Sequence, residues 1–506
     1  MKKILSFLMA LALSVTCLAT FVGCGGDDYP EEKGATIIRM IALEMPDYQK
    51  KWYDDVAREF NENLNDGIQL KIIYETKANL SSSIATTLEG KEQTAIYWCS
   101  PGNLYGTFVK NGRAANVANY ISKEAIADLT DAGKAAVTIN DIMYAYPMYF
   151  EPSMMYFYNK LVFEEVAAKQ KTNGVAVEDR LYNETTQEYN VPETWAELLA
   201  TCAAIKQYSK YNGQGFYPIS VPWGSALYWA TTGMELSTTG ETAIDDTWMN
   251  VNVDPEDEGW QAMTSFFWDI YMNGYAPQNM ASQLEYDYIV EQLIKGQFAT
   301  VIGYSAGMAE VNHQYGNSSK FETIGFAPMP IWENARNKDV APSVNGGWTY
   351  VINSKLNSDM AKKAAKVIEF FSYEDPARTA KLFEYSAYSR VSPNTSVRDY
   401  MDTLTIDAKY DYRTLIQEIA DKSIFAPHYS DAAQEQLKNE AYDVKDVIKE
   451  FKLRNGNAVV PSTDSRAITE IKAALASAKT EMQKKLNDEK YGYWNPIHDP
   501  ANKEQA

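Results

Sequence analysis

The sequence predicts an α/β protein with more than one domain, and three observations support this. Apolar strand-like segments alternate with amphipathic helical segments over residues 36–110, which is typical of parallel strands joined by right-handed crossovers. The chain has 506 residues, more than one ordinary core organises. Its hydrophobic content of 45% and aromatic content of 13% are sufficient for burial. We therefore expect two or three folded domains rather than a disordered chain.

The N-terminal residues have the pattern of a secretory signal. Two lysines precede an apolar run over residues 4–15, which is too short to span a membrane as a helix. A glycine before Cys24 closes the signal, an arrangement that resembles the bacterial lipoprotein signal, in which the cysteine is lipidated. We expect residues 1–23 to be removed, Cys24 to carry the lipid and residues 24–35 to form a tether. The alternative is a plain secreted protein with an incidental cysteine.

The acidic balance of the chain restricts its partners. The formal net charge is −20, and it becomes −22 without residues 1–23, which contain two lysines and no acidic residue. Such a surface repels nucleic acid and anionic lipid head groups. No other stretch reaches the roughly 18 apolar residues of a membrane span. We expect no nucleic-acid partner, and contact with the membrane only through the lipid anchor.

Cysteine and histidine are sparse. Cys99 and Cys202 lie in apolar contexts, so buried thiols are the simpler interpretation, although spacing does not exclude a disulfide. The three histidines are far apart, and no Cys/His cluster has the spacing of a zinc site. We therefore expect no metal and no cofactor.

The expected elements follow from hydrophobic periodicity. Near-continuous apolar runs indicate strands buried on both faces, and apolar positions at helical spacing indicate packed helices. At the start of the chain these are strands over 36–43, 68–74 and 95–99 and helices over 47–64, 80–89 and 104–110. Ligands gather at the carboxyl ends of parallel strands, which here are Glu44 and the turn over residues 98–103.

The aromatic stretch over residues 141–160 has two interpretations. Pro147 and Pro152 oppose a continuous central strand or helix, so we expect the chain to break and change direction between them. The stretch is then either an edge strand with aromatic packing or a crossing between two lobes. In the second case the side chains of residues 149–154 face the gap.

The rest of the chain continues the alternation. Residues 170–190 form a polar insertion that we expect at the surface. We expect helices over 161–169, from 192, and over 260–273, 288–295, 432–452 and 465–487. Residues 216–229 are expected to form a strand that leads into an aromatic turn, and residues 296–304 and 324–329 are expected to be strands. The tail over 495–506 is expected to be loosely ordered.

Seven segments in order resemble the family 1 extracellular solute-binding proteins of bacterial ABC importers. They are YAYP at 144–147, YFYNK at 156–160, VPETW at 191–195, GQFATVIGY at 296–304, FAPMP at 326–330, GGW at 346–348, and the block 361–371 with 389–393. Two features depart from the family. Gln93 and Thr94 replace a common Pro-Asp pair, and the insertion at 170–190 is longer than typical, which could reshape one rim of the cleft.

The resemblance implies a fold class and a division of the chain. The fold would be α/β, of the two-lobed periplasmic-binding-protein-like type II, with discontinuous lobes, a ligand cleft between them and a helical C-terminal extension. The N-terminal lobe would take 36–147 and 336–385, and the C-terminal lobe 148–335 and 386–506. The implied function is that of a monomer, anchored at the extracellular face of the cell membrane, which captures an oligosaccharide and delivers it to ABC permease subunits.

Sugar binding requires particular side chains. Flat aromatic faces cover the apolar face of a pyranose, and carboxylate, amide and guanidinium groups bind its hydroxyls. At the positions expected to line the cleft, the aromatic candidates are Trp98, Trp223, Tyr228, Tyr304 and Trp348, and the polar candidates are Glu44, Asn103, Glu151 and Arg390. Trp348 is the strongest, because Gly346 and Gly347 leave the backbone free to approach a ligand and hold the indole at a loop. For each tryptophan the alternative is core packing.

Other functions stay open at this point. Two of the 67 acidic residues could stand at glycosidase separation. However, we find no Gly-x-Ser-x-Gly, Walker A, His-Glu-x-x-His or dinucleotide motif, so we expect a binding protein without catalytic residues. A structural or adhesive lipoprotein would need repeats or stalks that the sequence lacks. The solute could also be a glycerophosphodiester or a peptide.

Overall fold

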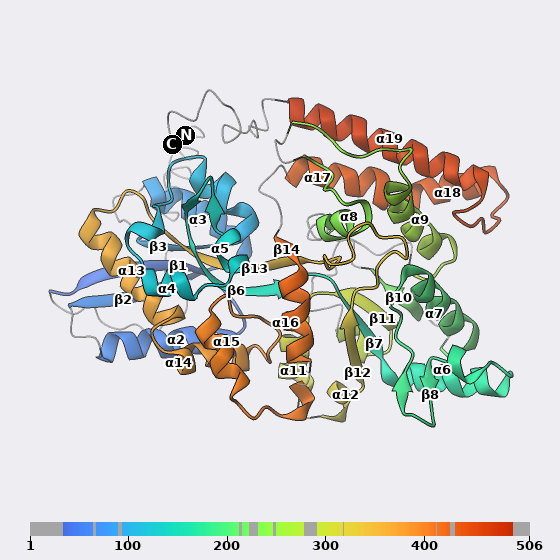
Figure 1. The fold of residues 1–506 in the computed structure, drawn as a ribbon, viewed down its shortest axis with the longest axis horizontal. Helices are drawn as coiled ribbons and strands as arrows, with labels where there is room; N and C mark the ends of the chain where they lie inside the picture. The colour runs from blue at the N-terminus through green and yellow to red at the C-terminus, as the bar shows by residue number, and fades with distance from the viewer. Residues whose placement is uncertain are drawn as a thin grey trace, which may run out of the picture.

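The chain forms two α/β lobes with a helical extension on the second (Figure 1). The computed structural model describes residues 34–63, 67–89, 94–211, 215–221, 231–245, 249–277, 291–316, 318–410, 412–425 and 431–488. The signal, Cys24 and the predicted tail lie outside these residues. Each lobe is built on one sheet, so the predicted α/β two-lobed class is confirmed.

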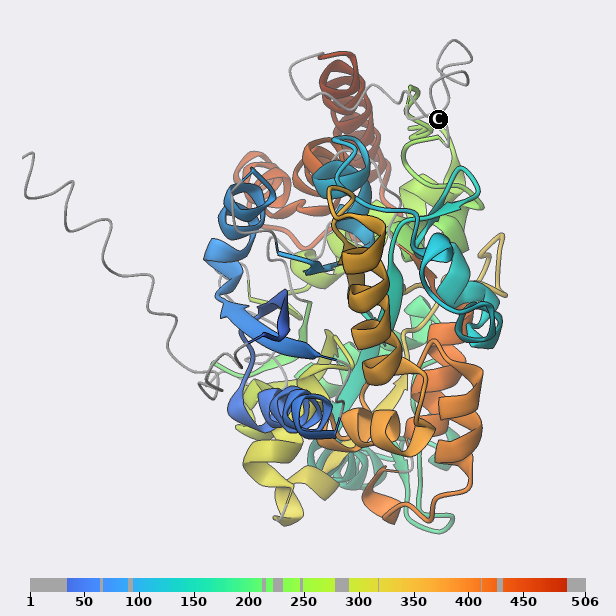
Figure 2. The ribbon, with the colours of Figure 1, turned by 90° about the vertical axis from the view of Figure 1, so that its left-hand side faces the viewer.

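The first lobe begins with the three predicted strands. β1 (Thr36–Leu43), β2 (Ile68–Glu75) and β3 (Ile96–Cys99) are parallel, and β1 lies between the other two. α2 (Asp47–Asn63) and α3 (Lys77–Glu89) connect them. Figure 2 shows the two helices on opposite sides of the β1–β2 layer. Right-handed crossovers require this, because the strand order reverses direction after β2.

The middle of this sheet is completed by a much later segment. β13 (Val344–Ile352) pairs antiparallel with β3 on one side and with β6 (Tyr146–Pro152) on the other. The helices that follow it, α13 (Ser358–Ser372) and α14 (Pro376–Tyr385), return to the same lobe. The first lobe is therefore discontinuous. Its buried core extends past residue 385, to Val397 and Met401 of α15 (Thr395–Asp402).

The aromatic stretch crosses from one lobe to the other. β6 belongs to the first sheet, and β7 (Met155–Asn159) belongs to the second. The predicted break between Pro147 and Pro152 is wrong, because the strand ends only after Pro152. β6 accepts Pro147 because β13 is its one partner strand among the described residues, as at a sheet edge. The side chains expected to face a gap, such as Tyr149 and Met154, are buried.

The second lobe has a four-stranded sheet in the order β10-β11-β7-β12. Alternate residues of β7 enter two different cores: Tyr156 and Tyr158 face one side, and Met155 and Phe157 face the other. The remaining strands are β10 (Tyr217–Ser220), β11 (Phe298–Gly303) and β12 (Ile324–Pro328). The helices are α6 (Lys160–Thr172), α7 (Trp195–Tyr208), α8 (Thr231–Thr239), α9 (Glu258–Met272), α11 (Gly307–Tyr315) and α12 (Ser319–Glu322).

The polar insertion lies at the end of the second lobe that is remote from the first lobe (Figure 1). Its small hairpin, β8 (Tyr182–Asn183) with β9 (Glu188–Tyr189), sits beside α6, and the Tyr189 hydroxyl donates to Glu164 at 2.6 Å. The surface location is confirmed. The suggested effect on a rim of the interlobe cleft is wrong, because the hairpin packs against the outer helix.

The helical extension packs on α9. Trp268 of α9 donates its indole N–H to the Val460 carbonyl at 2.9 Å, and Ser462 donates to Asp269. The predicted helix over 465–487 is confirmed as α19 (Ser465–Asn487). The predicted single helix over 432–452 is instead α17 (Asp431–Leu437), a π-helical turn (Lys438–Tyr442) and α18 (Lys445–Arg454).

Smaller elements complete the two lobes. The first lobe adds α4 (Lys123–Asp128), α5 (Asp131–Ala135), β4 (Thr138–Ile139) and β5 (Ile142–Met143). α16 (Arg413–Lys422) packs against β6 and β12, and β14 (Ile424–Phe425) pairs with the start of β13.

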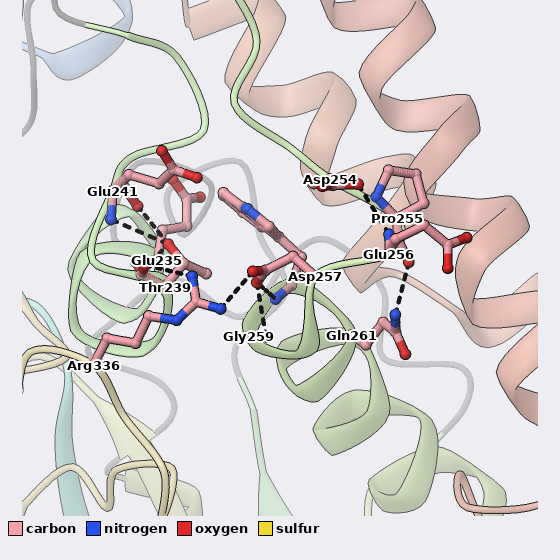
Figure 3. A network of polar contacts seen from close by, with 11 residues as sticks. Glu235, Thr239, Glu241, Asp254, Pro255, Glu256, Asp257, Gly259, Gln261 and Arg336 are labelled. Atoms are coloured by element: carbon pink, nitrogen blue, oxygen red, sulfur yellow. Dashed lines mark hydrogen bonds and ion pairs between the residues drawn. The ribbon is translucent and has the colours of Figure 1, made fainter.

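Arg336 joins the connection between β12 and β13 to the start of α9 (Figure 3). Its guanidinium forms an ion pair with Asp257, the N-cap of α9, and donates to the Thr239 carbonyl at the end of α8 at 3.1 Å. Burial raises the pKa of Asp257, but Arg336 and the amides of Trp260 and Gly259 outweigh burial and lower it.

Asp257→Asn is therefore expected to destabilise the protein in a pH-dependent way. A carboxylate with a lowered folded pKa contributes stability above its unfolded pKa of about 3.9, and this contribution is lost as the pH falls through the folded value. Asparagine still caps the helix, so the expected loss is up to ~1 kcal/mol near pH 7, as for a partly exposed pair. Denaturant unfolding at pH 7 and pH 3 measures it, with exposed Asp254→Asn as the control. An equal effect of Asp257→Asn at both pH values would contradict this assignment.

Candidate ligand-binding site

The two sheets present their carboxyl edges to each other. On the first lobe, β1 ends before Glu44 and β3 ends before the turn at Ser100. On the second lobe, β11 ends at Gly303 and leads into α11. Tyr48, at the start of α2, contacts Glu310 and His313 of α11, so the two carboxyl edges meet. Ligand sites of open α/β sheets form at this edge.

Glu44 and Asn103 lie where the sequence predicts them. Both are exposed, Glu44 directly after β1 and Asn103 in the short 3₁₀ turn after β3 (Pro101–Asn103). The Glu44 amide is held by the Glu75 carbonyl at 2.7 Å, which fixes the backbone at the strand end and leaves the carboxylate in solvent. The two side chains can therefore offer hydrogen bonds to a solute at this edge.

Trp98 and Trp348 come together, with ring centroids 6.2 Å apart. Trp98 is fully buried against Tyr53 and Tyr350, so in this conformation it presents no face to a ligand. Trp348 is half-buried and packs on the same core. Of the predicted tryptophans that the structure describes, Trp348 is the one that combines a fixed position with an accessible surface.

Gly347 has a different role from the one expected. The segment is the interior of β13 rather than a loop, and a register irregularity follows Trp348. Gly347 has φ +127°, and a Cβ there would lie 2.0 Å from the Tyr149 carbonyl oxygen. The glycine therefore permits the close approach of β13 to β6, which sets the position of Trp348 beside it.

Glu151 and Arg390, far apart in sequence, form a buried ion pair. Arg390 Nε lies 3.1 Å from Glu151 Oε2, and the guanidinium carbon lies 4.2 Å from the centre of the Tyr149 ring. Burial lowers the pKa of Arg390, but Tyr149 and Glu151 outweigh burial and raise it. The pair stands at the crossing, because Glu151 is on β6 and Arg390 follows α14. In this conformation it joins two segments of the chain.

A chain of hydrogen bonds leads from this ion pair to the second lobe. Arg390 Nη2 donates to Gln49 Oε1 at 3.2 Å, and Gln49 Nε2 donates to the Tyr48 hydroxyl at 2.9 Å. Tyr48 in turn donates to Glu310 Oε2 at 3.0 Å, and its ring stacks on His313 at a centroid distance of 4.3 Å. Burial first and then the Glu310 carboxylate raise the pKa of Tyr48, so the hydroxyl keeps its proton.

Three other predicted residues are placed differently. Tyr304 is buried at the end of β11. Trp223 and Tyr228 lie outside the described residues. The sequence analysis missed Tyr48, Gln49, Glu310 and His313, although both segments directly follow strand ends where ligands gather. Cys99 and Cys202 are free and buried, as the simpler interpretation predicted.

The chain matches the family model described as bacterial extracellular solute-binding protein over residues 55–414. Comparison with curated proteins gives no significant match. None of the helices among the described residues is long and apolar enough to cross a membrane.

Solved structures with the same fold include binding proteins. The GacH receptor of Streptomyces glaucescens, solved unliganded and with acarbose, has a TM-score of 0.61 at 14% identity, covering 89% of this chain and 99% of that chain. The cyclic α-maltosyl-1,6-maltose binding protein of Arthrobacter globiformis has a TM-score of 0.62 at 15% identity, covering 88% and 100%. A putative oligosaccharide-binding protein of Synechococcus has a TM-score of 0.64 at 12% identity, covering 89% and 98%.

These likenesses agree with the α/β fold described above. The family model spans residues 55–414, which include the crossing between the lobes and the return of the chain to the first sheet. This protein belongs to the bacterial extracellular solute-binding proteins.

Proposed function

We propose that this protein captures an oligosaccharide between its two lobes and delivers it, chemically unchanged, to the permease of an ABC importer. The observation that carries the proposal is the meeting of the two carboxyl edges, with a half-buried tryptophan and exposed hydrogen-bonding groups on the first lobe. A solute held there touches both lobes. It therefore stabilises the closed conformation by its differential contacts.

The chemistry of this edge suits a sugar. Trp348 offers an aromatic face for the apolar side of a pyranose, and Glu44 and Asn103 offer acceptors and a donor for hydroxyls. The solutes named for structures of the same fold, acarbose, cyclic α-maltosyl-1,6-maltose and maltose, support a sugar. The acidic balance of the chain, −20, disfavours an anionic solute such as a glycerophosphodiester.

Calorimetric titration tests the proposal directly. Maltotriose, a glycerophosphodiester and a short peptide are titrated separately, and the sugar is then recovered and analysed by chromatography. We expect saturable binding of the sugar and recovery of intact trisaccharide. Binding of the glycerophosphodiester or the peptide instead of the sugar would refute the proposal. The appearance of shorter sugars would also refute it and would indicate a glycosidase.

Trp348→Ala is expected to weaken sugar binding by ~1–3 kcal/mol, the free energy of losing one large apolar face. Trp348→Phe is expected to lose less, because it keeps part of the aromatic surface. Titration calorimetry measures both. The matched control is Tyr211→Ala, an aromatic residue that is 40% exposed beyond the end of α7 and contacts Phe216, the residue before β10. Wild-type affinity in Trp348→Ala would remove this residue from the site.

We also propose that the protein is a monomer, anchored at the extracellular face of the membrane by a lipid on Cys24. The lipoprotein-like signal before this residue supports anchoring. Acyl chains on the cysteine would hold the protein at the membrane, because each buried CH₂ group contributes about 0.8 kcal/mol of binding free energy. Incorporation of labelled palmitate into the membrane-bound protein would support the anchor. Recovery of all the protein in the medium would oppose it.

A further inference from the structure

One of the contacts between the lobes is a continuous series of side chains. On the first lobe these are Tyr48 and Gln49, and on the second lobe Glu310 and His313; we call these four residues the interlobe bridge. Both segments follow the carboxyl ends of strands, β1 and β11. Because these edges face each other, the interlobe bridge forms when the lobes approach and breaks when they separate.

Tyr48 is the centre of the bridge, because its hydroxyl both donates and accepts a hydrogen bond. Its hydroxyl donates to Glu310 and accepts from Gln49, and its ring stacks on His313 with an interplanar angle of 16°. Gln314 donates to the other oxygen of Glu310 at 3.1 Å, which orients this carboxylate towards Tyr48. The contact is thus directional and partly shielded from water. A hydrogen bond to a carboxylate is also stronger than a hydrogen bond between two neutral groups.

The bridge is also connected to the crossing between the lobes. Gln49 receives a hydrogen bond from Arg390, and Arg390 is held by Glu151, the penultimate residue of β6. A second tyrosine, Tyr410, donates to Asn312 of α11 at 3.2 Å and comes from the segment between α15 and α16. α11 is therefore contacted both from the facing edge and from a crossing segment.

A ligand binds a two-lobed protein more weakly when the closed conformation is rare, because part of the binding free energy is used to populate it. Direct contacts between the lobes raise the population of the closed conformation before any ligand arrives. The interlobe bridge is such a contact, and none of its residues needs to touch the solute to affect affinity.

We propose that Tyr48 and Gln49 are positioning residues for ligand capture, which hold the lobes closed through Glu310 and His313 and couple this contact to the Arg390–Glu151 pair at the crossing. The effect on ligand capture rests on the proposed function. The closure of the lobes by the bridge does not, because the bridge forms without a ligand. The breaking of the Tyr48 contacts would then limit the rate at which the binding site opens.

Solution X-ray scattering without ligand tests the closure. We expect Tyr48→Ala to increase the radius of gyration relative to the wild type, and Tyr48→Phe, which keeps the stack, to give a smaller increase. Tyr74→Phe is the matched control, since it removes a tyrosine–carboxylate hydrogen bond, to Asp54 at 2.7 Å, within one lobe. An unchanged or smaller radius in Tyr48→Ala, or an equal increase in Tyr74→Phe, would overturn the proposal.

Stopped-flow dissociation of maltotriose, followed by tryptophan fluorescence, tests the consequence for capture. We expect Tyr48→Phe to accelerate dissociation about ten- to hundredfold, the effect of one hydrogen bond to a charged group. Glu310→Ala, which removes the acceptor, should act similarly, and the double variant should be no faster than the faster single variant, because both remove the same bond. Additive effects, or no acceleration, would overturn the proposal. If the wild type does not bind maltotriose, the sugar assignment fails, while scattering still decides the bridge.

Discussion

Glu151→Ala is expected to lower the free energy of unfolding by about 3 kcal/mol, because it leaves a buried guanidinium without its carboxylate. Arg390 is 7% exposed, and the Glu151 carboxylate at 3.1 Å is the ion-pair partner that the structure gives it. Glu151→Gln should lose less, since the amide oxygen still accepts the Nε hydrogen bond. Denaturant unfolding with unchanged m-values measures the loss.

The control for this prediction is an exposed pair on α19. Lys484 and Glu481 lie 3.4 Å apart with side chains 75% and 40% exposed, so Glu481→Ala is expected to change stability by less than about 1 kcal/mol. If Glu151→Ala is no more destabilising than Glu481→Ala, the ion pair does not hold the crossing in the way described.

Gly347→Ala is expected to be at least as damaging. Its Cβ would lie 2.0 Å from the Tyr149 carbonyl oxygen, a backbone atom that cannot move without breaking the β13–β6 pairing. Its φ of +127° adds strain of about 1–3 kcal/mol for any side chain. We expect a loss of more than ~3 kcal/mol, seen as a lower unfolding midpoint or as loss of soluble protein.

Gly174→Ala separates the two causes. Gly174 also has a positive φ, +79°, but no atom lies within 4 Å of the position that its Cβ would take. It therefore reports backbone strain without a clash. Equal destabilisation by Gly174→Ala and Gly347→Ala would show that the close approach of β13 to β6 is not the cause.

The first part of the fold was predictable because its signals are local. The strands at 36–43 and 68–74 are short apolar runs between helix caps and turns, and both match β1 and β2 to within one residue. α19 likewise has an aspartate cap and an unbroken stripe of apolar residues. Periodicity could not separate α17 from α18, because two shorter helices bury the same stripe against the lobe.

The parts that local signals missed depend on distant pairing. Nothing near residues 344–352 indicates that this strand pairs with β3, some 250 positions earlier; the resemblance to a family implied the return, and the pairing is now seen. Trp98 illustrates the same limit at the site, since its position at a strand end is readable, but its burial depends on Tyr53 and Tyr350. Tyr48 and Glu310 are separated by 262 positions, so their contact has no sequence signal.

The central position of β13 also affects how a newly made polypeptide reaches its native state. The ribosome synthesises β3 and β6 long before residues 344–352. The edges of both strands that pair with β13 therefore stay unpaired while the intervening lobe is synthesised. Contacts of such long sequence separation form slowly and expose the chain to aggregation. The first sheet can be completed only after residues 344–352 have been synthesised, so this topology favours slow folding of the released chain over folding during synthesis.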